Sequence, residues 1–472
     1  MKVLEGLRPT AALEYFEALC AIPHGSRDTK RISDYCAAFA REHGLRYVQD
    51  AANNIVIYKP ATAGYETHPT VILQGHLDMV CEKDADCDID FATDGLRLAH
   101  DGNYIFAEGT TLGGDDGIAV AYALAVLAAD DIAHPPLEAV FTVDEEIGML
   151  GAAALDMSLL KGRVLLNCDS EDEGILTVSC AGGATSTLTL PVQREEKAAD
   201  GVWRLTVQNL IGGHSGVEIN KGRANANKVL AQILQRLPVR LIAVDGGSKD
   251  NAIPRACTAL VAAADPEAAF LAAADEVKKD LPSGETQVQF LCERADTTLA
   301  PMTQGSSDAV IGLLNALPNG VRAMSRDIEG LVQTSLNLGI LKTEAARVTM
   351  TFSVRSSVNT EKTALIEALQ RIGAEFGAGY SESGAYPAWE YRKDSRLRTV
   401  MVDTFERLYG KKPVVEAIHA GLECGIFSDA LSGLDAVSFG PQMHDIHTSR
   451  ERLDIASVGR TWDYLVAVLK AL

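Results

Sequence analysis

Hydrophobic and polar residues alternate with two different periods along the first third of the chain. Apolar residues recur at helical spacing in Pro9–Ala21 and Thr29–Glu42, whereas Asn54–Tyr58 and Thr70–Gln74 are short runs rich in apolar and β-branched residues. The alternation continues through an Ala-rich helix and two strands: Ile118–Ala129, Leu137–Val143 and Arg163–Asn167. Strands that alternate with helices predict an α/β fold, with a mixed sheet sandwiched between helices.

The pattern changes after residue 183. Thr185–Pro191 and Trp203–Gln208 alternate apolar and polar residues, as strands with one solvated face do, and helical segments follow them. Near residue 385 the α/β character returns, with a helix over Leu397–Tyr409 and a strand over Ala436–Phe439. We therefore expect one α/β domain, made of residues 1–183 and 385–472, interrupted by an inserted α+β domain over 184–384.

Composition and charge narrow the possible partners. Lys and Arg number 43 against 64 Asp and Glu, which gives the 472-residue chain a formal net charge of −21 and argues against nucleic acid and anionic membranes. The longest near-continuous apolar run, Ile118–Ala129, is shorter than the roughly 20 residues of a membrane span. The N-terminus does not resemble a secretion signal, and nine cysteines without a CxxC pair read as reduced thiols. We expect a cytoplasmic protein.

Two polar segments flank elements of the predicted α/β domain. His76 and Asp78 follow the strand Thr70–Gln74 and point to the same side of an extended backbone. One side chain could therefore bind a metal ion while the other orients that ligand. Asp115 and Asp116 follow two glycines at the start of a helix, where two carboxylates and no lysine favour a cation over a phosphate. Taken alone, His76 and Asp78 more often mark a polar strand end, and the glycines could merely form a turn with Asp116 as a helix cap.

Three further segments place acids or histidines after strands. The strand 137–143 ends in the acids 144–146, which repel one another strongly unless protonation or a metal ion relieves the repulsion. Asp169 follows the next strand, and His444 and His447 follow the strand near residue 438. Because functional groups in such sheets gather beyond the carboxyl ends of the strands, we expect these side chains to converge.

The converging donors predict a catalytic metal site. Imidazole and carboxylate ligands without cysteine suit a catalytic zinc ion better than a structural one. Five candidates are too many for one tetrahedral ion with an open position, and they suit two ions about 3.5–4 Å apart that share a bridging carboxylate. Glu145 is then left to act as a general base. The five candidate ligands are His76, Asp115, Glu146, Asp169 and His447.

Seven motifs, in order along the chain, carry a resemblance to a known family. They are "GHLDMVCEK", "TTLGGDDG", "DEEIGM", "LLNCDSED", "GGHSG", "GRANANK" and "GLECGIF". Together they resemble the di-zinc aminoacylase, carboxypeptidase and dipeptidase family, and within it the aminoacyl-histidine dipeptidase (peptidase D) branch. The resemblance covers nearly the whole chain. It implies a zinc-peptidase-like catalytic domain interrupted by a lid domain.

The resemblance also implies a role for each candidate ligand. His76 and Asp169 would bind one metal ion, Glu146 and His447 would bind the other, and Asp115 would bridge the two. Zn²⁺ is the expected metal, and Mn²⁺ or Co²⁺ fit the same ligands.

Residues beside the ligands have implied roles as well. Asp78 would orient His76, Glu145 would be the general base, and the peptide bond after Asp115 would be cis. This sequence departs from the branch at Asp116, where Asn is usual, so that Asp116 competes with Asp115 as a ligand.

A second departure concerns the terminal histidine. In the branch it is usually followed by Ser-Pro-Asp-Glu, and here His447 is followed by Thr-Ser-Arg-Glu. His444 therefore remains a rival ligand.

Residues of the predicted lid complete the site that the resemblance implies. His214, in "GGHSG", would polarise the scissile carbonyl or stabilise its oxyanion, from the same chain or from the partner of a possible homodimer. Arg355, at the end of a strand, suits bidentate binding of a peptide's C-terminal carboxylate. Asn251 and Glu423 are weaker candidates for substrate contacts, and Glu423 could meet a substrate α-amino group.

The resemblance thus implies metal-dependent hydrolysis of dipeptides of the Xaa-His or carnosine-like type, by a water between two zinc ions. A first alternative is a deacylase of N-acyl amino acids on the same metal site. A second is a non-catalytic binding protein on the same fold, against which the intact acids and histidines argue.

Overall fold

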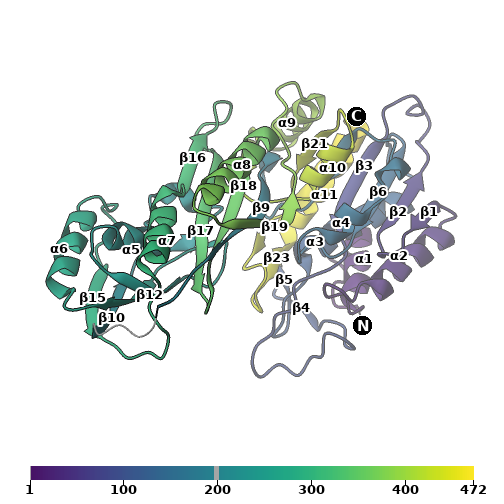
Figure 1. Cartoon of the computed structure of the whole chain (residues 1–472). Helices are drawn as coiled ribbons and strands as arrows, with labels where there is room; N and C mark the ends of the chain where they lie inside the picture. The colour runs from purple at the N-terminus through teal and green to yellow at the C-terminus, as the bar shows by residue number, and fades with distance from the viewer. Residues whose placement is uncertain (1, 196–200) are drawn as a thin grey trace. The chain divides into compact units, whose positions relative to one another are not determined.

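The computed structural model describes residues 2–195 and 201–472, and the chain forms two compact units (Figure 1). The first unit comprises residues 1–180, 389–417 and 422–472, and the second comprises 181–388 and 418–421. The observed boundaries fall after residues 180 and 388. The first predicted boundary, after residue 183, lies three residues later, and the second, after residue 384, lies four residues earlier. The short segment 418–421 groups with the second unit, which the sequence pattern did not indicate.

The first unit is built on an eight-stranded sheet. In order across the sheet, the strands are β1 (Arg46–Gln49), β2 (Ile55–Lys59), β6 (Leu137–Thr142), β3 (Val71–His76), β7 (Val164–Asn167), β21 (Asp435–Ser438), β8 (Ile175–Cys180) and β20 (Val414–Ile418). The central strands β6, β3, β7 and β21 run parallel, whereas β1 and β2 pair antiparallel, as do β21 and β8. This confirms the predicted mixed sheet.

Helices bury the sheet of the first unit. They are α1 (Thr10–Cys20), α2 (Lys30–Glu42), α3 (Gly114–Ala128), α4 (Leu150–Ala154), α9 (Arg396–Tyr409), α10 (Cys424–Ala430) and α11 (Ile455–Ala471), with a 3₁₀ turn at Met157–Leu159. Ile55 and Ile57 of β2 pack into one core cluster with α1 and α3, and Val56 between them is equally buried on the other face. Both faces of the sheet are therefore covered, as in the predicted sandwich.

Helix α3 is apolar on every side, and 13 of its 15 residues are buried. The predicted helix began at Ile118, and the observed one begins at Gly114, because Asp115 and Asp116 form a kinked first turn with non-helical backbone angles. A helix buried all round is held by packing rather than by an amphipathic face, so its start is fixed firmly in the core.

A small four-stranded sheet lies beside the large one in the first unit. Its strands, in order, are β22 (Met443–His444), β23 (Arg452–Asp454), β5 (Tyr104–Ala107) and β4 (Leu98–His100). The loop between β22 and β23 carries His447. The antiparallel pairing of Arg452 with Phe106 brings this loop close to the segment that leads from β5 into α3.

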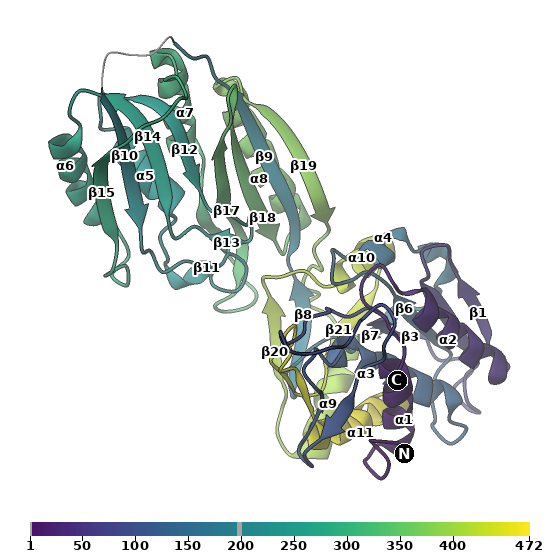
Figure 2. The ribbon, with the colours of Figure 1, turned by 90° about the horizontal axis from the view of Figure 1, so that it is seen from below.

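The second unit contains a nine-stranded sheet whose recorded pairings are all antiparallel (Figure 2). In order, the strands are β15 (Gln289–Arg294), β10 (Gly201–Gln208), β14 (Cys257–Ala263), β12 (Arg240–Gly246), β17 (Val332–Thr343), β18 (Arg347–Ser356), β9 (Gly182–Pro191) and β19 (Gly379–Tyr386), with β16 (Gly320–Met324) paired to β17. Alternate residues of β9 are buried, as expected when one face is covered.

Four helices pack with this sheet into one hydrophobic cluster. They are α5 (Ala226–Leu234), α6 (Glu267–Lys278), α7 (Gln304–Ala316) and α8 (Asn359–Glu375), with a 3₁₀ turn at Ile219–Lys221 and a two-stranded ribbon of β11 (Gly213–His214) and β13 (Ala252–Ile253). Among residues 2–195 and 201–472, no helix has the length and apolar character that crossing a membrane requires.

Candidate metal centre and active site

Three parallel strands deliver acids and a histidine to one edge of the sheet in the first unit. β3 ends at His76, β6 is followed by the acids 144–146, and β7 is followed by Asp169. β3 pairs parallel with both β6 and β7, so their carboxyl ends coincide. The side chains predicted to converge therefore do so, because the register of these three strands places them together.

Asp115 lies between two histidines that come from distant parts of the chain. Its Oδ1 lies 3.0 Å from Nε2 of His76, and its Oδ2 lies 3.2 Å from Nε2 of His447. The same Nε2 of His447 lies 2.9 Å from Oε1 of Glu146. The peptide bond between Asp115 and Asp116 is cis, as the resemblance implied.

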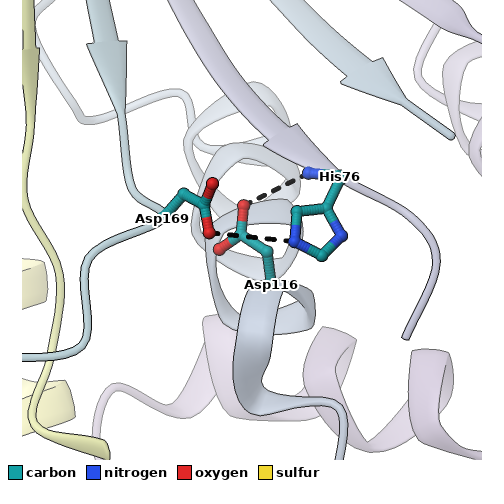
Figure 3. Close-up of side chains that lie close together, drawn as sticks. All are labelled: His76, Asp116 and Asp169. Carbon is teal, nitrogen blue, oxygen red and sulfur yellow. Dashed lines mark hydrogen bonds and ion pairs between the residues drawn. The ribbon is translucent and has the colours of Figure 1, made fainter. Parts of the chain in front are cut away.

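The side chains of His76, Asp116 and Asp169 also converge (Figure 3). Nε2 of His76 lies 3.7 Å from Oδ1 of Asp169, and the main-chain N–H of His76 donates to Oδ2 of Asp116 at 3.2 Å. Asp116 is fully buried beneath the imidazole, and its Oδ1 has no hydrogen-bond partner among the described residues.

Within residues 2–195 and 201–472, three groups of side chains bring ligand atoms within 4.8 Å of one another, a spacing that can hold a metal ion. Two of them share His76 as a member, and the third is separate from it. The groups are His76 with Asp116 and Asp169, His76 with Glu145 and Glu146, and Asp115 with Glu146 and His447. The five ligands predicted from the sequence are all members, and so are Asp116 and Glu145.

The charge balance of the cluster suits divalent cations. Two imidazoles face the carboxylates of residues 78, 115, 116, 145, 146 and 169, of which the first three are buried and the others partly buried. Carboxylates packed this closely repel one another, and a buried charge is costly unless it is paired. Nitrogen and carboxylate oxygen donors, with an orphaned oxygen on Asp116, are the environment that divalent metal ions occupy.

Asp78 is held rigidly beneath His76. Its carboxylate accepts hydrogen bonds from the main-chain N–H of Glu145 at 3.0 Å and from the hydroxyl of Ser26 at 2.8 Å. Nδ1 of His76 lies 2.9 Å from the carbonyl oxygen of Asp78 and 3.6 Å from its carboxylate. The carbonyl oxygen of Asp78 can accept a hydrogen bond from Nδ1–H, which leaves Nε2 of His76 free to bind a metal.

The histidines and acids shift one another's protonation. Hydrogen bonds that His447 donates to the carboxylates of Asp115 and Glu146 raise its pKa to about 10. Burial acts to lower the pKa of His76, but hydrogen bonds to Asp115 and Asp78 outweigh it and raise that pKa well above its usual range. Burial, reinforced by Asp116, raises the pKa of Asp169 well above its usual range. These shifts show how strongly the cluster attracts positive charge.

Glu145 differs from its neighbours. Burial raises the pKa of its carboxyl to about 8, with further upward contributions from Glu423 and Glu146 and an opposing one from His76. A carboxyl that titrates near neutral pH can both accept and return a proton.

The structure separates the two rival histidines. His447 contacts Asp115 and Glu146, whereas His444 packs edge-on against Tyr104, with ring centroids 5.7 Å apart. His447 has a positive φ of 58°, which turns its side chain out of the strand direction at the head of the β22–β23 loop.

A model of the peptidase family M20/M25/M40 matches residues 72–471 of the chain. The chain belongs to this family. It is a hydrolase acting on peptide bonds, from a family whose members depend on metal ions.

Two relatives match this M20-family chain over nearly its whole length. The cytosol non-specific dipeptidase of Escherichia coli (strain K12) is 38% identical, over 100% of this chain and 99% of that protein. The crystal structure of aminoacylhistidine dipeptidase from Vibrio alginolyticus is 39% identical, with a TM-score of 0.94 over 99% of this chain and 98% of that one. The aminopeptidase PepT from Bacillus cereus shares the fold, with a TM-score of 0.58 at 15% identity.

The remaining predicted residues of this M20 peptidase lie in two places. Glu423 precedes α10 in the first unit, fully buried, where its Oε2 accepts hydrogen bonds from Gln74 at 2.5 Å and from Thr142 at 2.6 Å. His214, Asn251 and Arg355 belong to the second unit.

In the second unit, His214 sits in β11 against β13, and Arg355 sits near the end of β18. Nδ1 of His214 accepts hydrogen bonds from the main-chain N–H groups of Gly216 and Val217, at 3.2 and 3.3 Å. Asn251 accepts a hydrogen bond from the main-chain N–H of Ser215 through its carbonyl oxygen, at 2.8 Å. Asn251 and His214 are therefore tied together by the backbone.

Arg355 has neighbours that sequence reasoning missed. Its Nη1 donates to the hydroxyl of Tyr386 at 3.2 Å, and its Nε is buried without a hydrogen-bond partner among the described residues. Burial and the charge of Arg355 lower the pKa of nearby His419 to about 4. His419 lies two positions before the motif "GLECGIF", and this proximity was the one available signal for it.

Proposed function

We propose that this chain is a dipeptidase that hydrolyses Xaa-His and carnosine-like dipeptides with the help of two divalent cations, Zn²⁺ above all. One observation carries the proposal: Asp115 lies between His76 and His447, and each histidine is also close to a further carboxylate. The full-length similarity to a protein described as an aminoacylhistidine dipeptidase supports the substrate class.

The five ligands divide into two sets. His76 and Asp169 would hold one cation, Glu146 and His447 would hold the other, and Asp115 would contribute to both sites. Mn²⁺ and Co²⁺ suit the same donors, because imidazole and carboxylate do not discriminate strongly among these metals.

When bound, the cations supply polarisation of the peptide carbonyl and a lowered pKa of the attacking water. Glu145 accepts the proton of that water and returns it to the leaving amine. The hydrogen bond from its main-chain N–H to the Asp78 carboxylate fixes Glu145 beside His76.

We propose that His214 stabilises the developing oxyanion. Its Nδ1 accepts two main-chain hydrogen bonds, so the proton of the neutral ring resides on Nε2, which becomes a donor. Burial and the charge of Arg355 lower the pKa of His214, which keeps the ring neutral at pH 7.

We propose that Arg355 binds the C-terminal carboxylate of the substrate, with Asn251 as a further contact. The unpartnered Nε of Arg355 and the adjacent hydroxyl of Tyr386 supply donors for an anion. Glu423 remains a candidate for the substrate α-amino group. A cytoplasmic location fits the nine free cysteines and the name of the similar E. coli protein.

The substrate class is tested by assaying the purified protein with matched substrates. Ala-His and β-alanyl-histidine represent free dipeptides, N-acetylhistidine represents an acyl amino acid, and Ala-Ala-His represents a longer peptide. We expect release of histidine from the two dipeptides and little from the other two. Faster hydrolysis of N-acetylhistidine than of either dipeptide would assign the chain to the deacylases instead.

A further inference from the structure

A carboxylate outside the ligand set joins the two segments that carry Asp115 and His447. Glu451 lies in the β22–β23 loop, four residues after His447, and only 3% of its surface is exposed. Its Oε2 accepts hydrogen bonds from the main-chain N–H groups of Leu112 and Gly113, at 2.7 and 3.1 Å. Its Oε1 accepts from those of Gly114 and Asp115, at 2.8 and 3.4 Å.

Four successive N–H groups pointing at one carboxylate form an anion-binding concavity that the protein fills itself. The turn is possible because Gly113 adopts a left-handed conformation, with φ of 66°. Gly114 allows the close approach of Glu451, since a Cβ there would lie 3.2 Å from Oε1. The two glycines that precede Asp115 in "TTLGGDDG" therefore allow this turn to bind the carboxylate of Glu451.

We propose that Glu451 is a positioning residue, whose carboxylate locks the turn 112–115 to the loop 447–451 and so fixes the separation of Asp115 and His447 for cation binding. The strand pairing of β23 with β5 brings the two segments together, and Glu451 sets their final register. The inference rests on the proposed function, because it assumes that Asp115 and His447 bind a cation.

Replacing the Glu451 carboxylate by an amide disrupts its hydrogen bonds without changing the size of the side chain. Glu451→Gln keeps the shape of the side chain but turns an NH₂ group toward main-chain N–H donors, so that at least one pair of hydrogen bonds is lost. The turn is then free to move, and with it the Asp115 carboxylate.

Glu138 offers a matched control in the same unit. It is also 3% exposed, and its carboxylate accepts hydrogen bonds from the main-chain N–H groups of Lys161 and Gly162 at 3.0 to 3.1 Å. It lies near the start of β6, whereas the acids of the metal cluster follow the end of that strand. Glu138→Gln therefore removes a similar buried clamp without touching the turn 112–115.

The test compares Co²⁺ binding by metal-free wild type, Glu451→Gln and Glu138→Gln. Affinity is measured by competition with a chelator, coordination by the visible absorption spectrum of bound Co²⁺, and stability by the melting temperature of the metal-free proteins. We expect both variants to melt earlier, but only Glu451→Gln to lose about 10- to 100-fold in affinity and to change the spectrum. With Zn²⁺ restored, kcat should fall in that variant with little change in KM.

The inference is overturned if Glu451→Gln melts earlier yet matches wild type in Co²⁺ affinity and spectrum. Should Glu451→Gln fail to fold, Gly114→Ala carries the test, since its Cβ displaces the carboxylate slightly and should alter the spectrum in the same direction. An unchanged spectrum in Gly114→Ala would then overturn the inference. If the proposed function itself is wrong, the wild-type protein would not bind Co²⁺ in this site, and that result is distinct from the failure of the inference on Glu451.

Discussion

Nε2 of His447 lies 3.2 Å from Oδ2 of Asp115, although 332 residues separate them in the chain. The contact joins the loop after β22 to the start of the buried helix α3. It also links the two halves of the first unit, which the second unit interrupts in sequence. The candidate metal centre therefore exists only when both halves have folded together.

The contact distinguishes the two histidines in a direct experiment. His447→Ala removes a group that touches Asp115 and Glu146, and we expect it to lose about one bound cation per chain and most hydrolysis. His444→Ala removes a ring that packs on Tyr104, and we expect it to keep the cation content of wild type. Elemental analysis of the purified variants measures both. Loss of metal from His444→Ala but not from His447→Ala would reverse the ligand assignment.

Glu145→Ala should separate metal binding from catalysis. The variant lacks the proposed base but keeps the five ligands, so we expect normal cation content and a loss of about 10²- to 10⁴-fold in kcat. Glu42→Ala, an exposed change at the end of α2, is the control for a lost carboxylate. Turnover close to wild type in Glu145→Ala would show that another group takes the proton.

The pH dependence of the metal-free protein follows from His447. Its pKa rises from the ordinary value of 6.5 to about 10 in the folded state, so the folded protein holds the proton more tightly than the unfolded one. The resulting stabilisation is complete below pH 6.5 and is lost as the pH rises toward 10. We therefore expect the melting temperature of the metal-free protein to fall between pH 7 and 10.

Two comparisons check this origin of the pH dependence. His447→Gln should show a flatter profile of melting temperature against pH than wild type. Because a cation must displace the proton on His447, zinc affinity should rise between pH 6 and 7.5. Zinc affinity that is constant over this range would contradict the assignment of His447 as a ligand.

Arg355 should recognise the negative charge at the end of the substrate. We expect Arg355→Lys to lower kcat/KM for Ala-His by about 10- to 100-fold, the range of a lost charge-assisted hydrogen bond. Arg347→Lys, at the exposed start of the same strand, is the control. The role of the substrate's C-terminal charge is tested with Ala-His amide, which lacks that charge and which wild type should cleave poorly. Equal losses for the acid and the amide in Arg355→Lys would exclude this role.

Much of this structure was predictable from the sequence because strand ends and polar residues coincide. β3 ends at His76, and β6 and β7 are followed within two residues by the acids 144–146 and by Asp169. Parallel pairing puts these residues on one edge of the sheet. The position of His447 was less accessible to pattern reasoning, since it lies in a loop whose location depends on the pairing of β23 with β5. Family motifs supplied what periodicity could not.

Other features left no usable signal in the sequence. β19 (Gly379–Tyr386) is rich in Gly and Ser and mostly exposed, and it forms because its backbone pairs with the edge of β9. Glu451 was missed as a positioning residue because its partners are main-chain N–H groups, which every residue but proline possesses. Contacts of this kind become visible only when the backbone has been placed.

The central claim is that two cations, held by His76, Asp115, Glu146, Asp169 and His447, make this chain a dipeptidase. The most direct measurement strips the protein with a chelator, returns Zn²⁺ in steps, and follows bound zinc and Ala-His hydrolysis together. We predict no hydrolysis without metal and recovery that is complete at two zinc ions per chain. Undiminished hydrolysis by the metal-free protein would contradict the claim.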